Sequence, residues 1–135
     1  MAIHEFRPGI EVTIEVDNAT LREYSTSNDE TEHKDDAVRL HQACWTVTNY
    51  VESVTSKHFS IKAHIHSDYE WDCPRLGFAV YVDGVKVRET VFTRPAHGNQ
   101  SQTHSTAGMY YGYSGEPGIF RKFTFAEIHP SECTK

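Results

Sequence analysis

Two histidines, His64 and His66, stand two positions apart in a segment that alternates between apolar and polar residues. Successive side chains of a β-strand point to opposite faces, so this spacing places both imidazoles on one face, with Cα atoms about 6–7 Å apart. Neutral imidazole binds zinc, copper, nickel or iron, and the pair therefore indicates a candidate metal site. Lys62 shares that face, which favours a solvated polar face without an ion as the alternative. A surface metal site would need a third ligand, for example His58, His104 or an acid.

A group of aromatic residues suggests a second kind of site. Its members are Tyr110, Tyr111, Tyr113 and Trp71. Aromatic rings stack on apolar faces while a hydroxyl or N–H group reaches water, so such a group is typical of a platform for a sugar or a peptide. Alternation places Tyr111 and Tyr113 on one face of a strand and Tyr110 on the other. At least one set is therefore expected in the core, and simple packing is the alternative interpretation.

Two clusters of charged residues are weaker candidates for a site. Asp68, Glu70 and Asp72 have a spacing that can hold calcium in a loop, but the segment lacks the glycine and the distal glutamate of an EF-hand. A solvated turn is the favoured interpretation of these acids. Arg121 and Lys122 are adjacent and would point to opposite faces of a strand. Pairing with an acid is favoured for them over ligand binding.

Motifs of the common enzyme classes are missing from the sequence. It contains no GxSxG, HExxH, GxGxxG or Walker motif, and no serine or cysteine stands in a recognisable nucleophile motif. An active site assembled from distant residues stays compatible with this pattern, because a sequence does not show proximity in space. We therefore expect a protein that is not an enzyme and that has no cofactor.

The elements that must position these candidates have the periodicity of strands. Residues 10–16 and 59–65 alternate strictly between apolar and polar types, which predicts half-buried strands. Residues 77–82 and 85–88 flank Asp83–Gly84, and this dipeptide predicts a hairpin with a type I′ turn. Further strands are expected at 21–24, 45–51, 109–113 and 119–128, the last with a β-bulge where its apolar parity changes.

Two polar stretches are expected to be loops, and the whole pattern indicates a fold class. Residues 25–36 contain no apolar member and predict an acidic surface loop, while residues 94–105 contain proline, glycine and small polar residues and predict a long loop. In total, the sequence predicts about seven or eight strands and no long helix. We expect an all-β fold: a single antiparallel β-sandwich or jelly-roll-like domain over residues 1–135.

Charge and cysteine content narrow the classes of partner and compartment. The 135 residues carry a formal net charge of −6, which disfavours nucleic-acid binding, and they include nine histidines. The sequence has no membrane span and no signal peptide, which predicts an intracellular protein of the cytoplasm or nucleus. Three cysteines, an odd number, fit a reducing compartment. A disulfide between Cys44 and Cys73 stays an open alternative.

The second half of the chain resembles a known family. The segments LGFAVYVDG at 76–84 and RKFTFAEI at 121–128 are similar to a fungal domain family of unknown function, and the strand at 9–13 and the stretch 48–52 follow its pattern in the same order. The resemblance implies a jelly-roll-like, all-β fold, a fungal origin and a location inside the cell. It implies no catalytic residues. The tyrosine-rich region near residue 110 departs from the tryptophan-containing strand that is common in the family.

Three functions are compatible with these patterns. The favoured hypothesis is a non-enzymatic interaction module that binds another protein, because edge strands of β-sandwiches readily add a partner strand. A homo-oligomer is a variant of this hypothesis. The alternatives are a lectin-like, carbohydrate-binding module that uses Tyr110, Tyr111, Tyr113 and Trp71, and a metal-dependent jelly-roll enzyme centred on His64 and His66.

Overall fold

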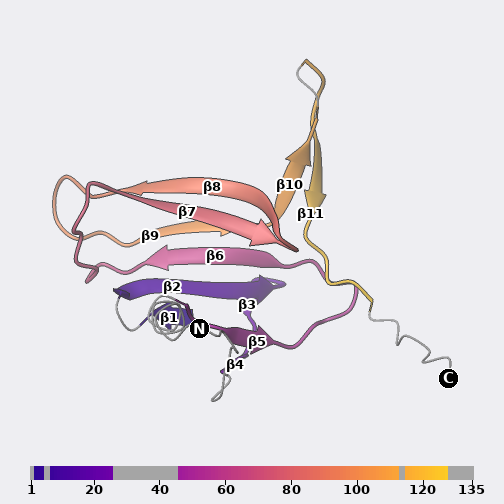
Figure 1. The fold of residues 1–135 in the computed structure, drawn as a ribbon, viewed down its shortest axis with the longest axis horizontal. Helices are drawn as coiled ribbons and strands as arrows, with labels where there is room; N and C mark the ends of the chain where they lie inside the picture. Colours follow the sequence, from indigo (N-terminus) through magenta and orange to yellow (C-terminus); the bar gives the residue numbers. More distant parts are fainter. Residues whose placement is uncertain (1, 5–6, 26–45, 113–114, 128–135) are drawn as a thin grey trace, which may run out of the picture.

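The antiparallel pair of β2 (Arg7–Val16) and β6 (Ser60–Ile65) lies at the centre of the largest sheet (Figure 1). The computed structural model describes residues 2–4, 7–25, 46–112 and 115–127. Ile10 lies opposite Ile65, Val12 opposite Ala63 and Ile14 opposite Ile61. Residues directly opposite each other share a face, so these pairs make one face of the sheet apolar. Both strands therefore form where strict alternation predicts them.

Three further strands extend this sheet. Its order is β1 (Ala2–His4), β2, β6 and β9 (Gln102–Thr106), and β3 (Ala19–Thr20) also pairs with β2. Asp17 and Asn18 connect β2 to β3 with φ angles of 51° and 61°. These angles suit a tight turn, because aspartate and asparagine tolerate the left-handed region.

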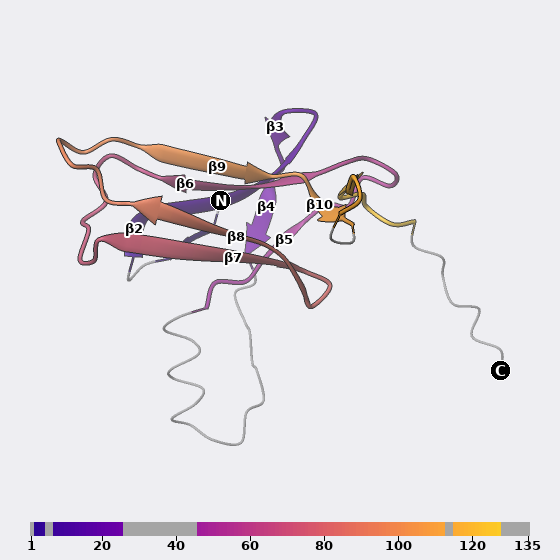
Figure 2. The same cartoon turned by 90° about the horizontal axis from the view of Figure 1, so that it is seen from above.

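The predicted Asp83–Gly84 hairpin is confirmed. β7 (Arg75–Val82) pairs with β8 (Val85–Thr93), and both turn residues have positive φ, 50° for Asp83 and 78° for Gly84. Seen from above, β7 and β8 lie along one side of the strands β6 and β9 (Figure 2). The register shifts once, between Val80 and Tyr81, which is the site of a bulge.

The core forms where this hairpin packs on the apolar face of the large sheet. Its buried members are Ala63, Ile65, Tyr69 and Phe92, and the partly buried residues packed against them are Ile10, Trp71, Leu76 and Phe78. Phe78 and Phe92 meet edge to face with ring centres 5.2 Å apart, and Tyr69 meets Trp71 in the same way at 5.3 Å. Burial of each large apolar side chain stabilises the fold by about 1.5–3 kcal/mol, so the contact between hairpin and sheet holds the domain together.

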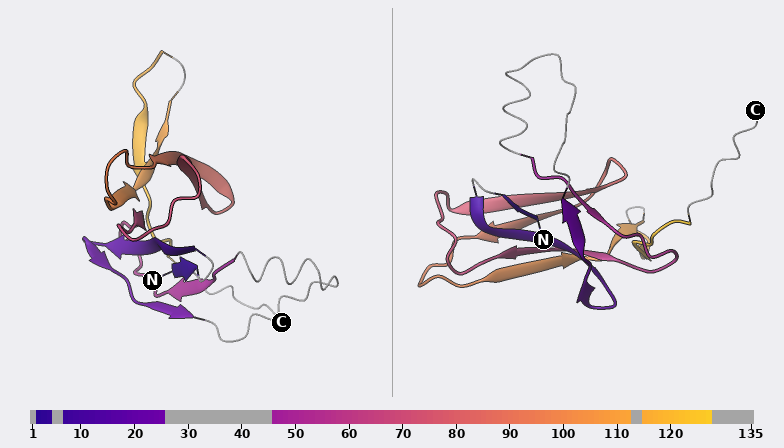
Figure 3. Two further views of the ribbon diagram at one scale, coloured as in Figure 1. Left: turned by 90° about the vertical axis from the view of Figure 1, so that its left-hand side faces the viewer. Right: turned by 90° about the horizontal axis from the view of Figure 1, so that it is seen from below.

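Two smaller sheets complete the fold. β4 (Glu23–Ser25) pairs with β5 (Asn49–Val51), and β10 (Gly108–Tyr111) pairs with β11 (Ile119–Lys122). The β10–β11 hairpin projects away from the other strands (Figures 1 and 3). At its base, the Phe59 N–H donates to the Phe123 carbonyl and the Phe123 N–H donates to the Ala107 carbonyl.

The prediction of an all-β, antiparallel fold is confirmed, since the described residues form strands and no helix. The strands form one five-stranded and three two-stranded sheets, and these separate sheets do not show the predicted sandwich or jelly roll. The described residues form eleven strands, of two to ten residues each, where we expected seven or eight.

Several predicted boundaries are wrong. The closing strand 119–128 ends at Lys122, because the chain then turns to bond with residues 56–59. The change of apolar parity at residues 125–126 falls beyond this end, so the predicted bulge within the strand is wrong. The predicted loop 94–105 is too long, since β9 begins at Gln102. The strands predicted at 45–51 and 21–24 are only three residues each, β5 and β4. The acidic stretch 25–36 lies outside the described residues, apart from Ser25 in β4.

We expect Ile65→Ala to destabilise the domain strongly. Ile65 is fully buried in the core cluster, so truncation removes contacts and leaves a cavity, at a cost of about 2–5 kcal/mol in the free energy of unfolding. Val91→Ala on the exposed side of β8 is the matched control, with an expected change within about 0.5 kcal/mol. Urea denaturation measures both, and equal midpoints would contradict this core.

Gly9 should not tolerate a side chain. Its φ is +92°, and a Cβ atom there would lie 3.0 Å from the Tyr69 Cα. We expect Gly9→Ala to lower the free energy of unfolding by about 1–3 kcal/mol. Gly77→Ala is the control, because a Cβ on Gly77 meets open space at an ordinary φ, and its stability should be unchanged or slightly higher. Thermal denaturation of the two variants compares them, and similar melting temperatures would contradict the close approach of the two segments.

Candidate functional site

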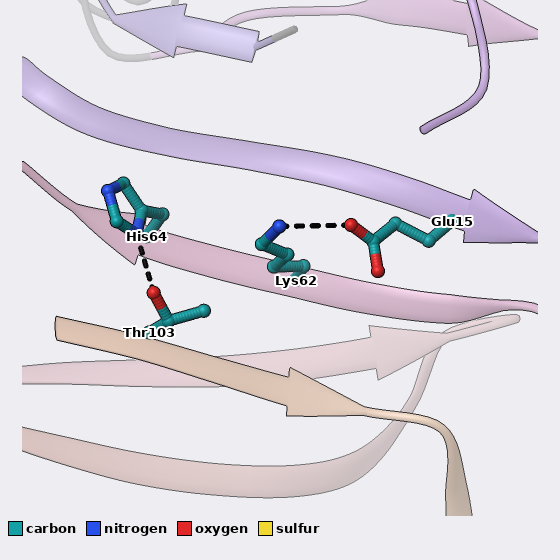
Figure 4. A network of polar contacts seen from close by, with 4 residues as sticks. All are labelled: Glu15, Lys62, His64 and Thr103. Carbon is teal, nitrogen blue, oxygen red and sulfur yellow. Dashed lines mark hydrogen bonds and ion pairs between the residues drawn. The ribbon is translucent and has the colours of Figure 1, made fainter. Parts of the chain in front are cut away.

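A network of polar side chains covers the face of the large sheet opposite the core (Figure 4). It comes from three neighbouring strands, because β6 lies between β2 and β9. Glu11 of β2 lies opposite His64, and His64 in turn lies opposite Thr103 of β9. The register that aligns the apolar side chains on the core face therefore also aligns acid, imidazole and hydroxyl groups on this one.

His64 and His66 lie side by side, as their spacing predicts. Their ring centres are 4.5 Å apart, and the ring planes meet at 85°. The His64 Nδ1 lies 2.5 Å from the Thr103 Oγ1, and the His66 Nε2 lies 2.9 Å from the Glu11 Oε2. Each imidazole is thus oriented through one ring nitrogen by a side chain of a different neighbouring strand.

Main-chain hydrogen bonds fix His66 just beyond the end of β6. The His66 N–H donates to the Gly9 carbonyl over 2.8 Å, and the His66 carbonyl accepts from the Tyr69 N–H over 3.1 Å. Tyr69 is buried in the core, so the turn that carries His66 is anchored from below. The position of this imidazole is therefore coupled to the packing of β2 and the core.

An ion pair extends the network along the sheet. The Lys62 Nζ donates to the Glu15 Oε1 over 3.0 Å, and the Glu15 side chain is only 16% exposed. Thr13, between Glu11 and Glu15 on β2, is buried although it lies on this polar face. The stem of Lys62 lies directly opposite Thr13, since the two residues pair across β2 and β6. Part of the polar face is therefore packed and not simply solvated.

His104 and His58, which the sequence offered as a third metal ligand, do not lie beside His64 and His66. His104 pairs with Ala63, so it lies on the core face of the sheet, where its Nε2 is buried without a hydrogen bond. The His58 Nδ1 lies 2.8 Å from the Thr124 Oγ1, next to the exit of β11. Within the described ranges, no group of three or more His, Cys, Asp or Glu side chains is arranged to hold a metal ion.

The structure does not gather the predicted aromatic platform. Trp71 packs on Tyr69 against the core, beyond the Ile65 end of β6. β10 follows β9, whose last residue Thr106 pairs with Ile61 at the other end of β6. Four residues of strand, about 13 Å, separate these two ends. Tyr113 lies outside the described residues, so Tyr110 and Tyr111 alone remain as neighbours.

Tyr110 and Tyr111 belong instead to a surface on β10 and β11. Tyr110 lies opposite Phe120 with ring centres 4.8 Å apart, and Tyr111 lies opposite Ile119. The exposed fractions are 67% for Tyr110, 50% for Tyr111, 64% for Ile119 and 42% for Phe120. Both faces of the hairpin therefore show large apolar side chains to solvent. Periodicity predicts a strand here but assumes that one of its faces is covered.

The charged candidates have ordinary surroundings. Arg121 stacks over the Tyr111 ring at 5.3 Å, and it lies with Lys122 on the exposed strand β11. Asp68 and Glu70 are exposed in the segment between β6 and β7. Cys73 is a free thiol whose Sγ donates to the Arg75 carbonyl, and Cys44 lies outside the described residues. None of these positions adds a ligand to the His64–His66 pair.

An ion pair on β8, outside the polar network, changes the pKa values of both its members. Lys86 and Glu89 bond to each other on β8, which raises the pKa of Lys86 and lowers the pKa of Glu89. The Glu89 contribution to stability is present above the ordinary carboxyl pKa and is lost as the pH falls through the lowered value. Both side chains are exposed, so the pair contributes little and belongs to the outer surface of the hairpin.

These observations define an antiparallel all-β protein with a polar network on one sheet face and an exposed apolar hairpin at one end. The chain belongs to the family described as Domain of unknown function (DUF7918), whose model matches residues 9–135. No curated protein matches the chain, and no solved structure matches it. In the part of the chain that the structure describes, no helix is long and apolar enough to cross a membrane.

We expect Lys62→Met to be more costly than Lys57→Met. The first change leaves the poorly exposed Glu15 carboxylate without its cation, at a cost of about 1–2 kcal/mol in the free energy of unfolding. Lys57 pairs with Asp17, which is 73% exposed and keeps its water, so a loss of about 0–0.5 kcal/mol is expected. Urea denaturation of both variants tests the difference, and a larger effect at Lys57 would contradict it.

Proposed function

We propose that this domain is a non-enzymatic protein-binding module and that the β10–β11 hairpin is its contact surface. The observation that carries this proposal is the exposure of Tyr110, Tyr111, Ile119 and Phe120 on both faces of one projecting hairpin. Single exposed apolar residues are common on protein surfaces, but a contiguous group of them is typical of an interaction site. Aromatic residues are also enriched among those that dominate binding energy.

The main chain of the hairpin supports the same function. Within the described residues, β10 and β11 pair only with each other, so each strand has an outer edge without a strand partner. An isolated two-stranded hairpin is marginally stable in water. A third strand from another protein would use the unpaired N–H and carbonyl groups and would cover one apolar face.

The charges of β11 indicate what kind of segment fits. Arg121 and Lys122 lie on β11 among the exposed apolar residues, whereas the whole chain has a net charge of −6. An extended segment of another protein that alternates apolar and acidic residues would complement both features. The overall negative charge disfavours a second copy of this chain as the occupant.

The remaining expectations belong to the same proposal. We propose an intracellular partner, which fits the reducing compartment that the cysteines suggest, and a fungal origin, which is supported by the sequence resemblance. We further propose that the β7–β8 hairpin and the large sheet are the two layers of a β-sandwich, which is supported by the core between them. The carbohydrate-binding alternative loses support, because Tyr110 and Tyr111 lie on opposite faces of β10 and Trp71 packs at the other end of the sheet.

Photo-crosslinking in native extract tests this function. A photoreactive amino acid replaces Ile119 on β11 in one protein and Val91 on β8 in another, both being exposed apolar positions. We expect position 119 to crosslink a defined protein through a segment with apolar and acidic residues, and position 91 to crosslink it weakly or not at all. Equal crosslinking at both positions would contradict the proposal.

Substitution of the hairpin then tests the contact quantitatively. We expect Ile119→Ser together with Phe120→Ser to weaken binding of the crosslinked partner at least tenfold, because both side chains lose apolar contact area. Val91→Ser is the matched control and should bind like the parent protein. Unchanged affinity of the hairpin variant, measured by calorimetry with circular dichroism as a check of folding, would overturn the assignment. A dimer in sedimentation or a positive glycan array in place of a protein partner would do the same.

A further inference from the structure

We infer that two copies of this chain associate through the outer edge of β7, in an antiparallel arrangement with Ala79 on the two-fold axis. The contact joins two β7–β8 hairpins into one continuous sheet. This inference is independent of the proposed function, because β7–β8 and β10–β11 are different hairpins. It rests on three observations: the unpaired edge of β7, the lack of charge along that edge, and the residue pairs that a two-fold axis creates.

The first observation is that one edge of β7 has no strand partner. Within the described residues β7 pairs only with β8, and it is β8 that contacts β9 and β10. β7 lies on the side of β8 that is farther from β9 (Figure 2). The Pro74 carbonyl accepts from the Arg94 N–H, so the even-numbered residues of β7 direct their main-chain groups towards β8. The main-chain groups of Gly77, Ala79 and Tyr81 therefore point to the outer edge.

The second observation is the composition of this edge. Residues 76–82 contain no charged side chain and no proline, and most of them are apolar or aromatic types that favour strands. Sheet edges usually carry a charge, a proline or a bulge that prevents pairing with another chain. The bulge of this hairpin places its extra residue, Val87, in β8, so β7 continues without interruption. The net charge of −6 opposes association of two copies, and an uncharged edge is where that opposition is weakest.

The third observation is the set of pairs that form when Ala79 lies opposite its own copy. Gly77 then lies opposite Tyr81, whose side chain is 59% exposed, and the tyrosine ring covers the open space beside the glycine. Arg75 lies opposite Asp83, which has the opposite charge. Both side chains are exposed, and neither forms an ion pair with another described residue. The second copy therefore supplies a partner for both.

The inner face of β7 matches its own copy as well. The same register places Leu76 opposite Val82, and Phe78 opposite Val80. All four side chains are half-buried in the single chain, and Leu76 and Phe78 pack against the core. Pairing therefore extends the apolar layer beneath the hairpin from one copy into the next, which removes further apolar surface from water.

Other registers that keep the two faces matched fit less well. A shift of two residues in one direction places Arg75 opposite Tyr81 and requires hydrogen bonds from the Arg75 main chain. The Arg75 carbonyl already accepts from the Cys73 Sγ over 3.1 Å. The same shift in the other direction moves Gly77 opposite the turn residue Asp83, which shortens the paired segment. The register between these two uses unpaired main-chain groups throughout and provides about six hydrogen bonds.

Sedimentation velocity of the tag-free chain over a range of concentrations tests the dimer. We expect a reversible equilibrium between monomer and dimer in the micromolar range, because a contact one strand wide is small. Ala79→Lys places two ammonium groups opposite each other on the axis and should weaken the dimer more than tenfold. Within one copy the new side chain lies beside Glu89, which pairs with Ala79 across the hairpin, so the hairpin itself should stay folded.

A mixture of two variants tests the register. Ala79→Glu alone should also weaken the dimer more than tenfold, because two carboxylates then meet on the axis. An equimolar mixture of the Ala79→Lys and Ala79→Glu proteins should associate again, since opposite charges meet there. A mixture that stays monomeric would overturn the two-fold arrangement around Ala79.

Val91→Lys is the matched control, because it makes the same charge change on the same face of the hairpin, one strand away from the edge. This variant should dimerise like the parent, and so should the protein with Ile119→Ser and Phe120→Ser. The inference is overturned if the parent stays monomeric at its highest soluble concentration, if Ala79→Lys dimerises like the parent, or if either control removes the dimer. A dimer that persists in the Ile119 and Phe120 variant leaves the proposed contact of β10–β11 unaffected. Circular dichroism checks that each variant folds.

Discussion

The antiparallel register between β2 and β6 determines the chemistry of both faces of the large sheet. With Ile10 opposite Ile65, the apolar side chains of both strands meet on the core face, and Glu11 comes to lie opposite His64 on the other. A shift of one residue would exchange the two faces and bury charged groups, so the burial of Ala63 and Ile65 strongly specifies the register. The positions of the polar side chains on the outer face are thus set by the packing of the core.

The β7–β8 and β10–β11 hairpins depend on the large sheet in different ways. β7–β8 gives the sheet its cover through Leu76, Phe78 and Phe92, and in return the hairpin is stabilised by burial. Among the described residues, β10–β11 receives no such cover, and Phe123 and Phe59 tie its base to the rest of the fold. A β-hairpin therefore has a structural role in β7–β8, where it covers the core, whereas in β10–β11 it leaves an apolar surface exposed to solvent.

The sequence predicts those features that depend on neighbouring residues. Alternation locates β2 and β6, and the Asp83–Gly84 dipeptide locates a hairpin whose turn has the expected positive φ angles. The spacing of His64 and His66 places both imidazoles together, as observed. Their partners Glu11 and Thr103 are not predicted, because they lie 55 and 39 residues away and only the strand register brings them close. The partial burial of Trp71 and the burial of the His104 Nε2 atom depend on which face the β7–β8 hairpin covers, and this is decided by tertiary packing.

The contrast in sequence distance between these elements also bears on how the chain folds. The β7–β8 hairpin closes across two residues, whereas Glu15 and Lys62 of the central pair are 47 residues apart. Hairpins form in about 1–10 μs, and a long loop must lose more entropy before its ends meet. We therefore expect the hairpin to form first, with the ring of Phe92 in water until β2 meets β6. During that interval the nascent chain has an apolar strand pair with free edges, which makes it prone to associate with other unfolded chains before its own sheet can cover it.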